Sequence, residues 1–138
     1  MLGEKKITPL NLFYIYVGNL IGSLAGIGLL LLAGLGPKLA DPAATIIQTR
    51  ITNLWFENIA LGVICGLLMY IAVNQYSLAP YMTIMCVMGF ILIGANHCIA
   101  DMAYVIIAIT VENWFPTIMA LICTTIGNII GCNLIPIC

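Results

Sequence analysis

Three long stretches without a charged side chain constrain what this sequence can fold into. They span Ile7–Pro37, Asn58–Ala100 and Asn113–Cys138, and are 31, 43 and 26 residues long. Because about 20 apolar residues cross a bilayer as one helix, the stretches predict one, two and one crossings. Only 7% of the residues are charged, against about 25% in a soluble domain. We therefore exclude a soluble globular domain and expect a single integral membrane domain over residues 1–138.

The apolar stretches show no alternation of apolar and polar residues, which a membrane β-barrel would require. An all-α bundle is expected instead, because a helix satisfies its own backbone polar groups in lipid. A polar connector should follow the first helix, from Lys38 to about Asn53. Lys5 and Lys6 precede the first stretch and place the amino end on the cytoplasmic side. We expect helices over residues 11–35, 54–73 and 115–135, and a further crossing that begins near 81.

The crossing that begins near Tyr81 changes character at residues 94–97, with the sequence Gly-Ala-Asn-His. His97 and Asp101 lie deep in this apolar crossing, and intramembrane ionisable residues by default mark ion or proton pathways. Four residues apart, they would share a helical face and could pair. Non-helical backbone at this depth is tolerated only beside protein or water. We therefore expect a broken helix that lines a cavity. The alternative is a buried histidine held by hydrogen bonds between helices.

A short pattern occurs twice in the chain. Val17–Ser23 and Ile126–Cys132 both read apolar-Gly-Asn-apolar-Ile-Gly-small. Glycines four residues apart let helix backbones approach closely. Weak internal symmetry of this kind is typical of transporters built from inverted repeats. The last three crossings would then form one repeat, the first helix would close another, and two crossings ahead of residue 1 would be missing. The shared residues are Gly18, Asn19 and Gly22, and Gly127, Asn128 and Gly131.

These segments together resemble the formate/nitrite transporter family, whose members are pentameric anion channels with an aquaporin-like fold. Segments 16–22, 61–65, 90–102 and 126–131 are similar to its third, fourth, broken fifth and sixth membrane helices. The specific signals are Gly-x-x-His-x-x-Ala-x-Met, which ends at Met102, and Gly-Asn-Ile-Ile-Gly, which ends at Gly131. The resemblance implies a polytopic, aquaporin-like inverted-repeat bundle, with about four crossings and one broken helix, that assembles as a homopentamer.

The resemblance also implies roles for single residues. His97 matches the family's central pore histidine, which interacts with the permeating anion and biases its protonation. Phe90 matches an aromatic constriction, and Arg50 falls near a lysine that attracts anions. Several positions depart from the family pattern, and two of them concern charge: Asn96 replaces a glutamate, and Asp101 replaces an asparagine. The expected substrate pathway consists of His97, Asn96, Phe90, Arg50 and Asp101.

The resulting hypothesis is a channel, in the inner or plasma membrane, for small monovalent anions of the formate, nitrite or hydrosulfide type, or their conjugate acids. The alternative is a non-transporting fragment, or one half of a split channel, because the family's first two helices have no counterpart here. An enzyme is disfavoured: the only serines, Ser23 and Ser77, lie outside any nucleophile motif. No metal or other cofactor is expected, since one histidine and six cysteines without a CxxC pair suggest none. A net charge of −1 offers no footprint for nucleic acid.

Overall fold

The computed structural model describes residues 8–74 and 80–134, and every regular element in these ranges is a helix. The elements are α1 (Pro9–Leu32), α2 (Gly36–Thr52), α3 (Trp55–Asn74), α4 (Pro80–Ile93), α5 (Cys98–Ala108) and α6 (Trp114–Leu134). The predicted all-α class is confirmed. The cytoplasmic signal of Lys5 and Lys6, and the last residue of the helix predicted to end at 135, lie outside the described residues.

Three helices, α1, α3 and α6, are long and apolar enough to cross a membrane. Helices α4 and α5 pass the same test together, although they are bent by 46° at the short break between them. The described residues therefore contain three spans, or four if the bent pair counts as one, which confirms a polytopic helical bundle with a broken helix. Large apolar side chains stay exposed along α1, α4 and the start of α6, as expected of a surface that faces lipid.

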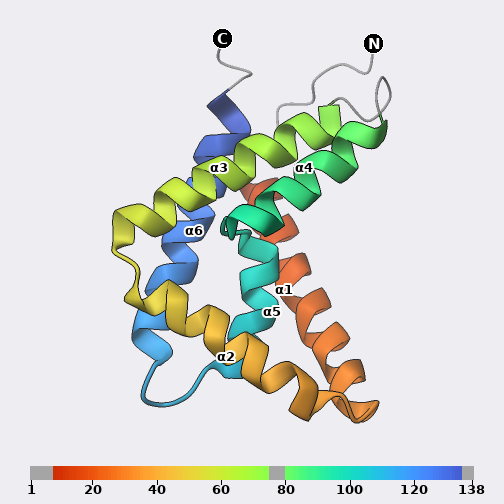
Figure 1. Ribbon diagram of the computed structural model, residues 1–138, viewed down its shortest axis with the longest axis vertical. Coiled ribbons are helices and arrows are strands. Elements are labelled where there is room, and N and C mark those ends of the chain that lie inside the picture. Colours follow the sequence, from red (N-terminus) through yellow and green to blue (C-terminus); the bar gives the residue numbers. More distant parts are fainter. Residues whose placement is uncertain (1–7, 75–79, 135–138) are drawn as a thin grey trace.

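Helices α3 and α6 make the most extensive contact in the bundle. They cross at four glycines, Gly62 and Gly66 on α3 and Gly127 and Gly131 on α6. A Cβ atom at any of these positions would collide with backbone of the other helix, for example 2.8 Å from the carbonyl oxygen of Thr124 for Gly62. Small residues therefore set the separation of these two helices, as is common in membrane bundles. Helix α4 packs beside α3, and α5 lies among α1, α2 and α6 (Figure 1).

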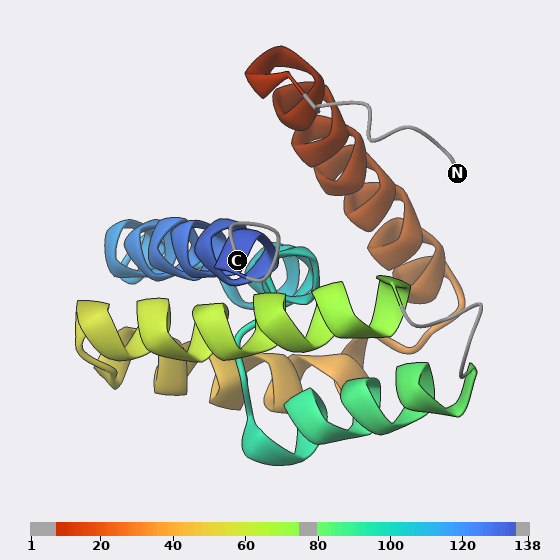
Figure 2. The same cartoon turned by 90° about the horizontal axis from the view of Figure 1, so that it is seen from above.

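Helix α1 leans away from the other five helices (Figure 2). Only 6% of its most apolar window is buried, against 39% for α6. It contacts α5, and Tyr16 Oη lies 3.1 Å from Thr125 Oγ1 of α6. A Cβ atom added at either glycine of its repeated pattern would meet nothing within 4 Å among the described residues, so these glycines are not in close contact with another helix.

The prediction of a polar connector between Lys38 and Asn53 is wrong, because most of this segment is helix α2. Pro37 lies in the first turn, where a proline costs the helix no hydrogen bond. The buried residues Ala43 and Ile47 are four apart, so they share one face. Helix α2 packs across α5, with a smaller contact to α6 (Figure 1). Of the charged side chains that suggested a connector, Lys38 and Asp41 are exposed, whereas Arg50 shares the buried side of the helix and is 12% exposed.

Two glycines end helices in the same way. Gly34 follows α1 with φ +76°, and Gly94 follows α4 with φ +69°. After α4, the amide of Gly94 donates to Ile91 O at 3.1 Å and that of Ala95 donates to Phe90 O at 2.9 Å. This paired pattern is a Schellman motif, which needs a residue in the left-handed region and so favours glycine. Gly94 therefore fixes where α4 stops, and the predicted break of the third crossing, which begins near residue 81, is confirmed.

Candidate functional site

The break between α4 and α5 is held in place by Asn128 of α6. Its Nδ2 donates to the carbonyl oxygens of Gly62 at 2.9 Å and Asn96 at 2.8 Å. Its Oδ1 accepts from the backbone N–H of Cys98, also at 2.9 Å. Backbone groups freed at a helix break must find partners when they lie away from water. One side chain thus supplies partners to the break itself and to the first residue of α5, and ties both to α3, which places Asn128 beside the site.

A row of buried amides continues from the break toward α2. Asn96 has no exposed surface, and its Nδ2 donates to Asn58 Oδ1 at 2.9 Å and to Thr124 Oγ1 at 3.2 Å. Asn58 is 2% exposed, and its Nδ2 donates to the carbonyl oxygen of Arg50 at 2.8 Å. Its Oδ1 also accepts from Asn53 Nδ2 at 3.2 Å. Asn58 therefore connects the break to the end of α2.

Sequence reasoning did not select Asn58. Its only signal is that it is an amide in the first turn of an apolar helix, at the start of the longest uncharged stretch. A buried polar group costs free energy unless it is hydrogen-bonded, so such a residue predicts partners on other elements. That reasoning would have marked Asn58 as a contact residue without identifying what it contacts.

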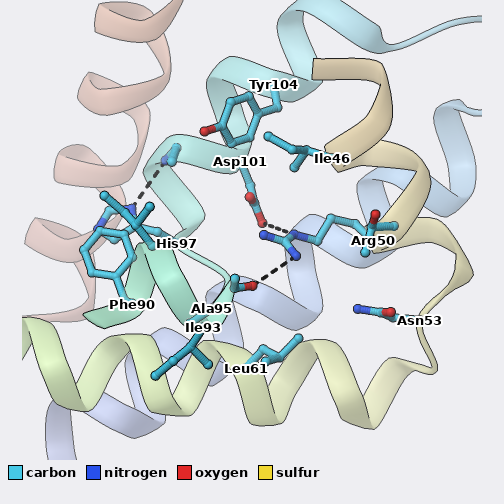
Figure 3. A pocket seen from close by; sticks show the side chains of 14 residues that line it. Ile46, Arg50, Asn53, Leu61, Phe90, Ile93, Ala95, His97, Asp101 and Tyr104 are labelled. Atoms are coloured by element: carbon cyan, nitrogen blue, oxygen red, sulfur yellow. Dashed lines mark hydrogen bonds and ion pairs between the residues drawn. The ribbon is translucent and has the colours of Figure 1, made fainter. Parts of the chain in front are cut away.

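His97 occupies the N-cap position of α5. Its Nδ1 accepts from the backbone N–H of Ala100 at 3.3 Å. Since Nδ1 is an acceptor, the neutral ring carries its proton on Nε2. The ring also stacks on Phe90, with the centroids 5.7 Å apart and the planes inclined by 27°. The two residues come from opposite sides of the break and lie together at one wall of the site (Figure 3).

The expected pairing of His97 with Asp101 is wrong, because Asp101 pairs with Arg50 instead. Arg50 Nε lies 3.5 Å from Asp101 Oδ2, and Arg50 Nη1 donates to Gly94 O at 3.4 Å. His97 stands before the first helical residue, and its Nδ1 turns back to cap the helix. Arg50 lies in the last turn of α2, where the helix dipole favours a cation. The side chains of Arg50 and Asp101 are 12% and 3% exposed.

These groups surround a cavity of about 510 Å³. Four of the five predicted pathway residues line it, namely Arg50, Phe90, His97 and Asp101. The fifth, Asn96, is fully buried behind the wall. A smaller hollow of about 250 Å³, between the ends of α2, α3 and α6, shares Arg50 and Asn53 with it. The cavity is shown in Figure 3. Its lining is apolar except for a few convergent polar groups, which is typical of small-molecule sites.

The first copy of the repeated pattern is not part of this site. A Cβ atom at Gly18 or Gly22 would meet nothing within 4 Å in the described chain. Asn19 Nδ2 donates to Ile15 O of its own helix at 2.9 Å. The structure therefore brings the second copy, but not the first, to the break between α4 and α5.

Comparison with known proteins identifies a family for this chain. The family model described as formate/nitrite transporter matches residues 5–138. Comparisons with curated proteins and with solved structures gave no match. The match includes α1 to α6, and so contains the cavity and all its lining residues.

Proposed function

Because the chain belongs to the formate/nitrite transporter family, we propose that it forms a membrane pathway for small monovalent anions or their conjugate acids. Formate, nitrite and hydrosulfide are the proposed permeants. The observation that carries the proposal is the cavity beside the break, where His97, Phe90 and Arg50 converge from α2, α4 and the start of α5. A helix break that lines a cavity at membrane depth is the usual form of a transporter binding site.

His97 is the proposed central residue of the pathway. With Nδ1 held by the Ala100 amide, Nε2 is the ring nitrogen left to meet a permeant. Nε2 donates a hydrogen bond when the ring is neutral, and gives up a proton when the ring is charged. The stacked Phe90 fixes the plane of the ring and narrows the space beside it. A small anion or acid would therefore pass along the edge of this stacked pair, where it meets a single directed donor.

The proposed setting is the inner or plasma membrane, with the amino end in the cytoplasm and five copies in one assembly. Support comes from the family and from the large exposed apolar residues, such as Leu32, Leu92 and Val111, which need lipid or protein around them. Native mass spectrometry from detergent should give the mass of five chains. A mass of one chain under conditions that preserve known membrane oligomers would contradict this assembly.

The function is tested by uptake of formate, nitrite and hydrosulfide into liposomes that contain the purified chain. We expect faster uptake than into protein-free liposomes. Phe90→Trp should slow uptake severalfold, because the larger ring occupies the cavity. Phe13→Trp makes the same change on the exposed face of α1 and serves as the matched control. Rates equal to those of protein-free liposomes for all three anions would contradict the proposal and favour a non-transporting fragment.

A further inference from the structure

The charge of the cavity is set by two residues. Arg50 and Asp101 are the only Asp, Glu, Lys or Arg among the described residues that line it, and they carry opposite charges. The shortest distance between them joins Arg50 Nε to Asp101 Oδ2, at 3.5 Å. With His97 neutral, the described lining therefore has a net charge of zero. An arginine that would otherwise attract anions is here occupied by a carboxylate of the same chain.

Burial makes this compensation effective. The two side chains are 12% and 3% exposed, so water screens their fields only weakly. An anion that enters the cavity meets the attraction of Arg50 and the repulsion of Asp101 at similar range. It could bind Arg50 fully only by displacing the carboxylate, which would leave a buried unpaired charge at high cost. The pair therefore opposes the entry of a bare anion.

The carboxylate also lacks the hydrogen bonds that a buried acceptor needs. Within the described chain, neither Asp101 Oδ1 nor Oδ2 accepts a hydrogen bond, and Arg50 Nε donates none. Buried polar atoms almost always have partners, supplied by the protein, by water or by a ligand. A bare anion has no proton to offer Asp101. An uncharged molecule that has both a donor and an acceptor could satisfy Asp101 and Arg50 together.

We propose that Asp101 is a specificity-determining residue: its carboxylate cancels the charge of Arg50 in this cavity, so that the cavity favours an uncharged hydrogen-bond donor over the corresponding anion. The inference rests on the proposed function and refines it, since it selects the conjugate acid as the species held at this point of the pathway.

The test compares formate with formamide, which has nearly the same size and shape but is uncharged and carries N–H donors. Binding to the purified full chain is followed by the shift in its thermal unfolding midpoint. Formamide should stabilise the wild-type chain more than formate at equal concentration. Asp101→Asn should reverse this order and lower the half-saturating formate concentration by at least about tenfold, because Arg50 is then uncompensated. An unchanged formate concentration in Asp101→Asn would overturn the proposal.

A matched control separates a local effect from a change in net charge. Glu112→Gln alters the net charge of the chain by the same amount in an exposed turn before α6, away from the cavity. It should leave both affinities as in the wild type, and an equal gain in formate binding by this variant would overturn the proposal. The double variant Arg50→Gln/Asp101→Asn keeps the test decisive if Asp101→Asn alone does not fold. It leaves no lone charge in the cavity and should therefore keep the wild-type preference for formamide; a preference for formate in this variant would contradict the assignment, because no uncompensated Arg50 would then be present to explain it.

The outcomes for the two proposals can be told apart. If wild-type liposomes take up no anion, the transport function fails, while the binding experiment still decides the role of Asp101. If wild-type liposomes take up formate and Asp101→Asn has the same half-saturation in uptake and in binding, the transport function stands and the role of Asp101 fails.

Discussion

The two copies of the Gly-Asn pattern, in α1 and in α6, have nearly the same residues and very different surroundings. In α6, Gly127 and Gly131 lie against the backbone of α3, and Asn128 makes three hydrogen bonds to other segments. In α1, a Cβ added at Gly18 or Gly22 would meet nothing, and Asn19 bonds to its own helix.

The difference shows what a Gly-Asn pattern requires before its helix can pack closely on another helix and its asparagine can bind other segments. Helix α3 presents glycines of its own, Gly62 and Gly66, opposite those of α6, so the two backbones can approach. The break between α4 and α5 then supplies the free backbone groups that Asn128 binds. A glycine pattern on one helix only permits close packing. In α6 the close packing forms because α3 also presents glycines, and Asn128 finds partners because the broken helix leaves backbone groups free.

The largest expected effect comes from filling the space between α3 and α6. Gly127→Ala would place a methyl group against the backbone of Ile59 and Gly62, which cannot move aside as a side chain could. We expect the free energy of unfolding to fall by about 3 kcal/mol, the upper part of the range for overpacking. Unfolding in mixed detergent micelles, followed by helical circular dichroism, measures it.

Gly22→Ala is the matched substitution in α1. It should raise the free energy of unfolding by up to about 1 kcal/mol, because alanine is the better helix former and an added Cβ meets no other atom at this site. Equal losses in the two variants would break the comparison, since the glycines of α1 would then also be in close contact.

A smaller effect is expected from the asparagines. Asn128→Ala leaves the Cys98 amide and two carbonyl oxygens without their partners, and should cost about 2 kcal/mol. Hydrogen exchange at the Cys98 amide should also become faster. Asn19→Ala should change stability by less than about 0.5 kcal/mol, because its bond is a local, exposed one. An Asn128→Ala variant with unchanged exchange at Cys98 would contradict the claim that Asn128 holds the break between α4 and α5 in place.

The smallest expected effect concerns the attachment of α1. Tyr16→Phe removes the hydroxyl that lies 3.1 Å from Thr125 Oγ1, and should cost about 0.5 kcal/mol, typical of one hydrogen bond between membrane helices. Tyr14→Phe, on the exposed face of the same helix, is the control and should cost nothing measurable. A loss of several kcal/mol from Tyr16→Phe would show that α1 is held more tightly than its exposed surface indicates.

Much of the helical framework could be predicted from the sequence. The charge-free stretches locate α1, α3 and α6 to within a few residues, and the Gly-Ala-Asn-His segment locates the break, because each signal is local. Helix α2 could not be distinguished from a polar connector, because its hydropathy is low and it contains prolines. The spacing of Ala43 and Ile47 is nevertheless helical.

The candidate site was predictable in its members but not in its pairings. Four of the five predicted pathway residues line one cavity. The partner of Asp101 was not predictable, because Arg50 lies on α2, a helix that the sequence analysis did not predict. Asn58 was overlooked for a similar reason. Its hydrogen bonds join it to Asn96 and to the end of α2, and these partners lie beside it only in the folded protein.

The most direct test of the proposed pathway is the pH dependence of formate uptake by liposomes that contain wild-type or His97→Ala protein. Histidine is the side chain whose change of charge lies closest to physiological pH, so uptake is measured between about pH 5 and 8. Uptake by the wild type, corrected for protein-free liposomes, should change steeply across that interval, and His97→Ala should flatten the profile. Identical profiles for the two proteins at every pH would contradict the role given to His97.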